Sequence, residues 1–262
     1  LETAPGILNQ GALELVDSVI TENSGDGTLV AGLYNAVGAI ATLTNVTVSH
    51  NTNSELGGRV AGIYNSGSMT LNRCTIHDNS SGYEYAEAAG IFSDGVLSLV
   101  NSTVSGNWSY GACGGVSMGG TAELINSTIA GNEAAWDWDA DAPGCGGLCS
   151  GGTVSLTNTI VANQTMGTDC GGTITSLGHN LDSDGTCGLA AAGDLPNADP
   201  LLGPLQDNGG PTETHALQVG SPAVDAGDDT ACPDADQRGV FRPQDGDFGG
   251  REQARKGQDQ QR

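Results

Sequence analysis

Apolar and polar residues alternate in short runs along most of this chain. A segment close to Leu-x-Asn-Ser-Thr-Val-x-x-Asn recurs at 15–23, 43–51, 71–79, 99–107 and 124–132, with a shortened copy at 156–163. A second run begins where Gly precedes an apolar residue, at Gly32, Gly62, Gly90, Gly115 and Gly147, and a third run lies between these two. Alternation with period two predicts short strands that each bury one face.

The spacing of these runs predicts a repeat architecture. The closing residues are Asn23, Asn51, Asn79, Asn107, Asn132 and Asn163, and their steps are 28, 28, 28, 25 and 31. Three short strands in about 28 residues suit one coil of a parallel β-helix, in which each strand stacks on its counterpart in the next coil. We therefore expect an all-β solenoid with coils over 1–172, an irregular C-terminal cap continuous with them over 173–250, and a flexible polar tail over 251–262.

The six closing asparagines predict an internal ladder. Asn tolerates a left-handed backbone at a tight corner, and its side-chain amide can bond to the backbone. Stacked coils would place these amides above one another. The alternative, a set of unrelated turn residues, does not explain the near-constant steps.

The C-terminal part carries a separate group of motifs. They are Ser-Leu-Gly-His-Asn-Leu at 176–181, Asp-Pro-Leu-Leu-Gly-Pro-Leu at 199–205, Asp-Asn-Gly-Gly-Pro-Thr at 207–212, Gly-Ser-Pro-Ala-Val-Asp-Ala-Gly at 220–227 and Asp-Gln-Arg-Gly at 236–239. This string resembles the end of the choice-of-anchor Q proteins, which are bacterial secreted or surface proteins similar to polymorphic outer-membrane passenger domains and pectin-lyase-like folds. The resemblance implies a right-handed β-helix and an extracellular or cell-surface location. It implies no common reaction.

Charge and composition limit the classes of partner that this chain is expected to bind. The net charge is −23, and residues 1–237 contain only Arg59 and Arg73 as fixed positive charges. Nucleic-acid binding depends on Lys and Arg that neutralise phosphates, so this chain is not expected to bind nucleic acid or anionic membranes. The sequence has no run of 18 or more apolar residues, so we expect no membrane insertion. An acidic surface fits a soluble extracellular protein and is compatible with cation binding.

The seven cysteines suggest disulfides, as expected outside the cell. Cys113 and Cys145 each lie two residues before the second Gly of their repeat, which predicts neighbouring positions about 4.8 Å apart on adjacent coils and a disulfide between them. Cys170 and Cys187 would close a short loop. We interpret the others as buried thiols (Cys74, Cys149) and a residue without its family partner (Cys232). Zinc is the rival interpretation, but no Cys-x-x-Cys pair supports it.

Catalysis is the weaker of two functional hypotheses. A β-helix lyase would need a Lys or Arg base and carboxylates that hold Ca²⁺, and a glycoside hydrolase would need two carboxylates facing one cleft, roughly 5–10 Å apart. The sequence shows neither arrangement. His50 and His77 are most simply exposed turn residues, whereas His179 and His215 would make hydrogen bonds within the tail motifs. No cofactor is expected except Ca²⁺ at Asp137, Asp139 and Asp141, for which a solvated acidic loop is the simpler interpretation.

Aromatic residues mark one edge of the predicted coils. Three consecutive repeats carry two aromatics at spacing two after the ladder Asn, namely Tyr83 and Tyr85, Trp108 and Tyr110, and Trp136 and Trp138. Residues two apart in an extended segment point the same way, so an aromatic and acidic strip should line one edge. The alternative is that the rings only shield the coil.

The sequence thus predicts a structural or adhesive protein that presents this strip to an extracellular glycan or protein partner. A polysaccharide-binding or polysaccharide-cleaving enzyme of pectin-lyase-like fold is the alternative. The first coil, which begins near Gly6, would offer unpaired backbone groups for self-association.

Overall fold

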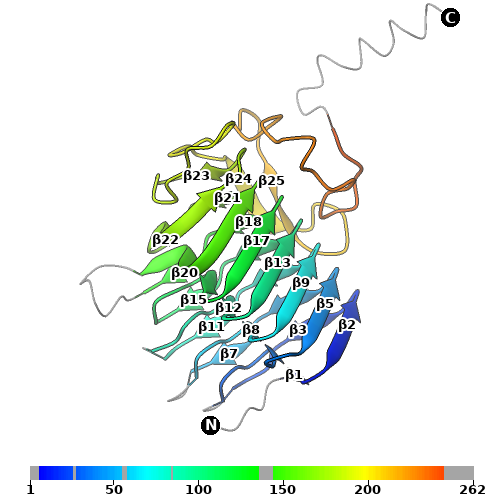
Figure 1. The fold of residues 1–262 in the computed structure, drawn as a ribbon, viewed down its shortest axis with the longest axis vertical. Coiled ribbons are helices and arrows are strands. Elements are labelled where there is room, and N and C mark those ends of the chain that lie inside the picture. The colour runs from blue at the N-terminus through cyan, green and yellow to red at the C-terminus, as the bar shows by residue number, and fades with distance from the viewer. Residues whose placement is uncertain (1–5, 26–27, 55–57, 84, 136–143, 245–262) are drawn as a thin grey trace, which may run out of the picture.

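A computed structural model describes residues 6–25, 28–54, 58–83, 85–135 and 144–244 (Figure 1). In these ranges the protein is all-β, and its parallel strands stack as a solenoid of about 5 turns whose counterparts lie about 28 residues apart. The predicted fold class is therefore confirmed. None of the described residues forms a helix long and apolar enough to cross a membrane.

Three main columns of strands form the coils, as the three alternating runs predict. The first column contains β1 (Ile7–Asn9), β4 (Leu33–Asn35), β8 (Ile63–Asn65), β12 (Ile91–Ser93) and β16 (Val116–Met118). The second contains β2 (Ala12–Val16), β5 (Ile40–Thr44), β9 (Ser68–Asn72), β13 (Val96–Val100) and β17 (Thr121–Ile125). The third contains β3 (Val19–Thr21), β6 (Thr47–Ser49), β10 (Thr75–His77), β14 (Thr103–Ser105), β18 (Thr128–Ala130), β21 (Ile160–Ala162) and β23 (Leu181–Asp182).

Two further features were not predicted. Four two-residue strands form a short fourth column, β7 (Thr52–Asn53), β11 (Ser80–Ser81), β15 (Trp108–Ser109) and β19 (Glu133–Ala134). The long strand β20 (Cys145–Thr157) spans the first and second columns, so they merge into one 12-stranded sheet, and β22 (Thr168–Ser176) pairs with it. The pairing of β22 with β20 contains two register shifts and continues past residue 172 to Ser176, so parallel pairing extends into the region interpreted as the cap.

Inward-facing apolar side chains fill the coil interior. Each main column contributes a line of fully or almost fully buried residues that are in register between coils, for example Leu43, Leu71, Leu99, Leu124 and Leu156. Burying such a side chain contributes roughly 1.5–3 kcal/mol. One coil cannot bury its own inward face from both sides, so stacking provides the core.

An amide ladder runs through one corner of the stack. Asn23 Nδ2 donates to Asn51 Oδ1 over 2.7 Å, and the same bond continues through Asn79 and Asn107 to Asn132. Each acceptor oxygen also takes the backbone N–H of the preceding rung. These five rungs confirm the predicted ladder.

The last predicted rung is wrong. Asn163 is exposed, and Gln164 accepts the bonds from Asn132. The register Thr128↔Ile160 explains the shift, because it places residue 164, not residue 163, opposite Asn132. Asn163 instead has φ of 59°.

The left-handed conformation also lies elsewhere than expected. It occurs one residue before each rung, at Glu22, His50, Asp78, Gly106, Gly131 and Asn163. The ladder asparagines are not among the described residues with positive φ. In each coil, one residue therefore makes the tight turn, and the residue after it forms the amide ladder.

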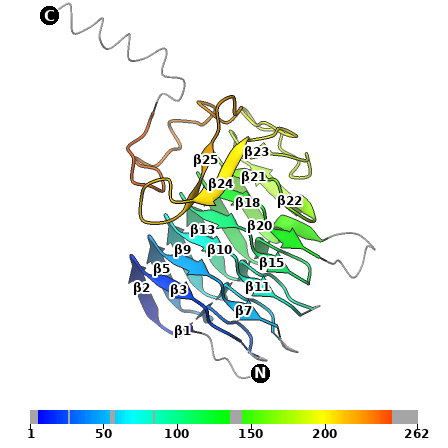
Figure 2. The same ribbon diagram turned by 180° about the vertical axis from the view of Figure 1, so that it is seen from behind.

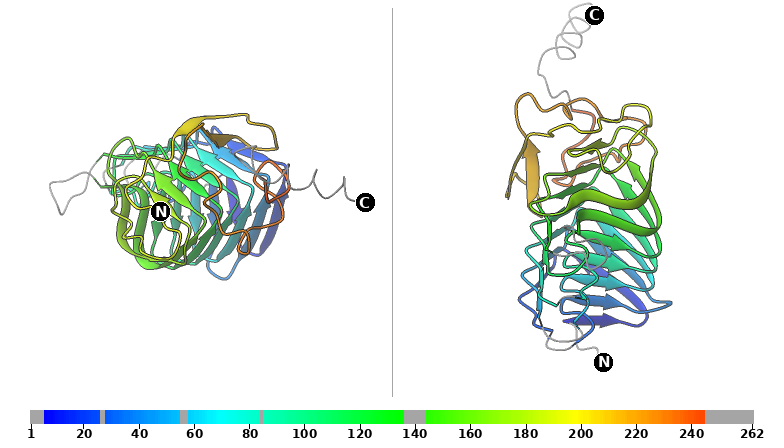
Figure 3. Two further views of the ribbon diagram at one scale, coloured as in Figure 1. Left: turned by 90° about the horizontal axis from the view of Figure 1, so that it is seen from above. Right: turned by 90° about the vertical axis from the view of Figure 1, so that its left-hand side faces the viewer.

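The C-terminal segment does more than cover the end of the stack. Cys187 and Leu189 join the apolar core beyond the last coil, and Leu195 bridges to β23. The chain then folds back along the third column with an antiparallel hairpin of β24 (Leu202–Gln206) and β25 (Thr214–Leu217). Figures 2 and 3 show this hairpin outside the coil, beside the third-column strands.

Gln237 fixes the returning segment to the coils. Its Nε2 donates to Thr75 Oγ1 over 2.8 Å and to Thr212 Oγ1 over 2.9 Å, and its Oε1 accepts from Thr103 Oγ1 over 2.8 Å. The side chain is buried between them. The Asp-Gln-Arg-Gly motif thus has a structural role in docking this segment.

Candidate functional site

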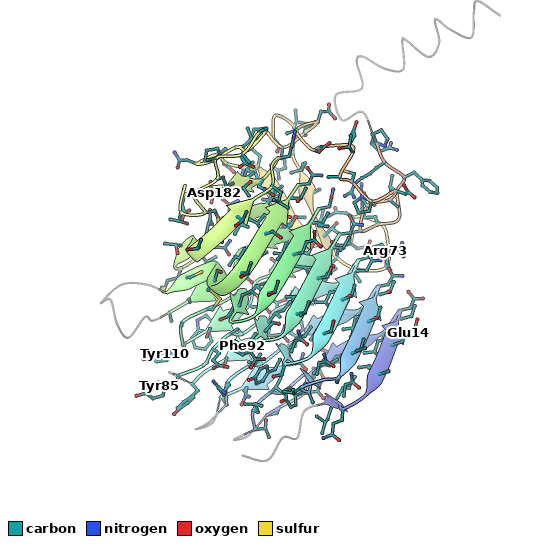
Figure 4. All side chains as sticks on the ribbon, viewed as in Figure 1. Glu14, Arg73, Tyr85, Phe92, Tyr110 and Asp182 are labelled. Carbon is teal, nitrogen blue, oxygen red and sulfur yellow. A yellow bond between two sulfur atoms is a disulfide. The ribbon has the colours of Figure 1, made fainter. Side chains whose placement is uncertain are left out.

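Three residues of the predicted aromatic strip, Tyr83, Tyr85 and Tyr110, lie on connections that join the fourth column of one coil to the first column of the next, and Trp108 lies in β15 of the fourth column. The connections between these columns run over 82–90, 110–115 and 135–144 in three consecutive coils. Figure 4 shows Tyr85 and Tyr110 on the same edge of the stack. Their backbones are also adjacent, since Ala112 N–H donates to Ala86 O over 3.3 Å.

The rings contact each other in pairs within a coil. The Tyr83 and Tyr85 rings meet at 5.4 Å in a T-shaped arrangement, and those of Trp108 and Tyr110 lie 6.4 Å apart. Tyr85 is 57% exposed and Tyr110 is 42% exposed. The edge therefore combines mutual packing, which the shielding alternative expects, with aromatic surface left open to solvent.

Two acidic residues in the described part of this edge, Glu87 and Glu133, are engaged within the protein. Glu133 Oε1 accepts from Trp108 Nε1 over 3.1 Å, which fixes the indole against the next coil. Glu87 pairs with Arg59. These carboxylates position the edge, and the exposed contact surface that the structure describes here is aromatic.

Part of the predicted strip lies outside the described residues. Trp136 and Trp138 belong to this group, as does the expected Ca²⁺ site at Asp137, Asp139 and Asp141. The role of the two tryptophans in the strip and the Ca²⁺ site therefore stay predictions.

One of the two predicted disulfides is present, and the other is wrong. Cys170–Cys187 is confirmed, but Cys113 bonds to Cys149 and Cys145 is a free thiol. Cys113 and Cys145 do lie opposite each other on adjacent coils. Residues directly opposite in a parallel pair hold their Cβ atoms about one strand spacing apart, roughly 4.8 Å, whereas a disulfide needs roughly 3.5–4.5 Å. Adjacent register therefore does not favour a disulfide.

The position of Cys149 reverses its interpretation as a buried thiol. It lies in the outward line that elsewhere holds Tyr34, Tyr64 and Phe92, whose rings stack at 5.1 and 4.9 Å. Cys113 lies in the neighbouring line with Val60. The disulfide thus joins the line of Tyr34 to the line of Val60. In the earlier coils, apolar side chains of these two lines pack against each other.

The remaining thiols are unpaired. Cys74 is a buried free thiol and Cys232 is also free, as predicted. The Sγ atoms of Cys113, Cys145 and Cys149 all lie within 4.8 Å of one another. Burial raises the pKa of Cys145 to about 12, so this thiol stays protonated and is a poor metal ligand beside an intact disulfide.

A pocket of about 820 Å³ lies between the third column and the returning segment. Two of its charged groups make their printed contacts within the returning segment itself. Asp228 accepts hydrogen bonds from Thr230, and Asp236 pairs with Arg238. The Thr230 hydrogen bonds hold the pKa of Asp228 below its ordinary value.

The two tail histidines make the expected hydrogen bonds. His179 Nδ1 lies 2.7 Å from Ala226 O, and His215 lies between Ser105 Oγ at 2.9 Å and Gly203 O at 2.7 Å. Burial lowers the pKa of His215. These contacts give the pocket a structural interpretation.

The other two histidines differ from expectation. His50 is exposed at a turn, as predicted, but His77 is buried in β10. Coil stacking brings both rings next to Asp78, a grouping that sequence analysis missed. Aligning the repeats by strand register would have revealed it, since His77 aligns with Ser49, the neighbour of His50.

Comparisons with known proteins add no relative. No family model, no curated protein and no solved structure matches this chain.

Proposed function

We propose that this protein is an extracellular structural or adhesive β-helix that binds a partner through its aromatic edge. The observation that carries the proposal is the exposure of Tyr85 and Tyr110 on neighbouring coils of a stiff stack. Tyr and Trp are favoured at binding hot spots because they offer large contact areas at low entropic cost. The resemblance of the tail motifs to choice-of-anchor Q proteins supports a secreted or surface location.

A neutral glycan is the partner that fits this edge best. Sugar rings stack on exposed aromatic faces, and a net charge of −23 disfavours anionic polymers. A protein partner and self-association through the first coil are other outcomes. Polysaccharide cleavage in a pectin-lyase-like manner is the alternative function, but in the larger pocket Asp228 and Asp236 are engaged by Thr230 and Arg238 of the same segment.

A pull-down with insoluble cellulose, chitin, xylan and mannan tests the proposal. The double variant Tyr85→Ser/Tyr110→Ser should reduce binding roughly tenfold or more, as expected for loss of hot-spot aromatics. Phe241→Ser is the matched control, because Phe241 is an aromatic residue that is 75% exposed on the returning segment. A second variant with Ala at Trp108, Trp136 and Trp138 tests the rest of the strip.

Circular dichroism must show that each variant keeps the β-helix. Absence of wild-type binding to all four polysaccharides would contradict the glycan proposal. Equal binding by folded wild type and both edge variants would show that the rings only cover the coil.

A further inference from the structure

Two consecutive coils place three nitrogen and oxygen ligands at one corner of the stack. His50 and Asp78 occupy equivalent left-handed positions, with φ of 53° and 51°. His77 precedes Asp78 at the end of β10, and its carbonyl accepts the backbone N–H of His50. The side chains of all three residues therefore emerge at one place.

The potential ligand atoms are close together. His77 Nδ1 lies 2.8 Å from Asp78 Oδ2, and His50 Nε2 lies 3.9 Å from the same oxygen. The two imidazole rings meet edge to face at 5.6 Å. One donor atom from each residue lies within 4.8 Å of the other two. His50 and Asp78 are largely exposed, so small rotations can shorten these distances.

The backbone does not need these side chains. Gly106 and Gly131 take the equivalent left-handed corner in later coils, and Ser49 and Ser105 take the place of His77. A non-glycine residue in the left-handed conformation costs roughly 1–2 kcal/mol. The fold therefore accounts for the corner but not for its two imidazoles and carboxylate.

A second carboxylate approaches from the returning segment. Glu213 Oε2 lies 4.0 Å from His77 Nε2, on the ring side opposite to Asp78. A ligand histidine usually donates its other N–H to such an outer carboxylate, which fixes the tautomer and the ring orientation. Without a metal ion, Nδ1 of neutral His77 donates to Asp78 Oδ2. With an ion at the corner, the proton would move to Nε2 on the Glu213 side, and the Nδ1 lone pair would face the ion.

We propose that His50, His77 and Asp78 bind one divalent first-row transition-metal ion of the zinc class, and that Glu213 positions His77. Two imidazoles and one carboxylate match the ligand set of zinc sites that keep one position open. The side chains of His50 and Asp78 are more than half exposed, so a water molecule or an outside ligand can reach the open position from solvent. Hard oxygen-only ions such as Ca²⁺ do not fit imidazole ligands.

The test uses the full, untagged chain after removal of metal by a chelator. Zn²⁺ affinity is measured by competition with a chromophoric chelator, and Co²⁺ is added in parallel as a spectroscopic probe. The wild type should bind one Zn²⁺ per chain and give visible Co²⁺ bands without sulfur-to-cobalt charge transfer in the near ultraviolet.

The two histidine variants introduce the residues that other coils carry at the equivalent positions. His50→Gly and His77→Ser should each lower Zn²⁺ affinity at least roughly tenfold, and Glu213→Gln should lower it about tenfold as an outer partner. Asn163→Gly is the matched control, because Asn163 occupies the same left-handed corner several coils away. It should bind Zn²⁺ like the wild type.

Far-ultraviolet circular dichroism confirms that each variant is folded. The proposal is overturned if the wild type binds no Zn²⁺ at micromolar concentration or if both histidine variants bind as well as the wild type. Strong sulfur-to-cobalt bands would place the ion at the cysteines and would overturn it as well.

Discussion

The coil stack and the returning segment are held by different kinds of interaction. In the stack, the same contacts recur in every coil, with parallel backbone pairing, buried apolar lines and an amide ladder. The segment over 202–244 is held by single polar contacts, among which Gln237 makes the most. Repetition spreads stability over many equivalent sites, whereas the segment depends on a few.

Position-specific contacts also attach the segment to a second tight corner, between the second and third columns, where Asn101 and Asn158 have positive φ. Asn101 Nδ2 donates to Ala235 O over 3.0 Å, and its Oδ1 accepts from Arg242 over 2.7 Å. Asn158 exchanges two hydrogen bonds with Asp228. Both asparagines have positive φ, and their side-chain amides face the returning segment, which leaves Asn101 buried. The same residue type thus stabilises the stack at one corner and docks the segment at another.

If the stack and the segment differ in this way, the largest loss of stability should come from a substitution in the middle of the ladder. Asn107→Ala removes the acceptor of Asn79 and the donor to Ile76 O, and it leaves buried polar groups without partners. We expect a loss of about 4 kcal/mol in the free energy of unfolding. Urea denaturation followed by circular dichroism measures it. Asn163→Gly, outside the ladder, should change stability little, and equal effects of the two would contradict the ladder's role.

A smaller and local effect is expected for the segment. Gln237→Leu removes its hydrogen bonds to Thr75, Thr103 and Thr212, which should weaken docking by about 2 kcal/mol. Hydrogen exchange should accelerate over 202–244 and stay unchanged in the coils. If exchange in the coils accelerates equally, the two regions form a single cooperative unit and the comparison fails.

The smallest effect is a pH dependence at the hairpin. Gly203 O can only accept, so neutral His215 donates from Nδ1 and accepts the Ser105 hydroxyl at Nε2. Burial lowers the pKa of His215 from its ordinary value of 6.5, so protonation favours the undocked segment. Docking stability is complete above pH 6.5 and is lost as the pH falls below that value.

Hydrogen exchange of 202–217, corrected for the intrinsic pH effect, measures this change. The variant His215→Gln should remove the pH dependence, and it separates this histidine from His77 and His179. An unchanged pH response in that variant would assign the effect to another group.

The features that repeat from coil to coil are also the ones that the sequence predicts well. The strand columns and five ladder rungs follow from near-constant steps, and the Cys170–Cys187 pair follows from its short loop. The last rung failed because counting from Asn to Asn ignored strand register, in which Gln164 replaces Asn163. Aligning Ala130 with Ala162 would have corrected it.

Non-repeating contacts were beyond this reasoning. Side-by-side docking of the segment depends on single pairs such as Gln237 with Thr103, which have no periodic signal. Cys113–Cys149 crosses between two outward lines, so its pairing depends on side-chain direction as well as coil register. The cluster of His50, His77 and Asp78 combines adjacent positions of two coils, so it is found only when the repeats are aligned by strand register.

The connections on the aromatic edge differ in length without disturbing the stack. One runs over 110–115 and the next over 135–144, yet the ladder bonds stay between 2.7 and 3.3 Å from Asn23 to Gln164. The entropic cost of a longer loop grows only slowly with its length. Insertions and deletions are therefore absorbed at this edge, one coil at a time. A peptide grafted between Ser109 and Val116 would be displayed at a defined height along a rigid rod, which makes the fold a scaffold for spacing foreign epitopes.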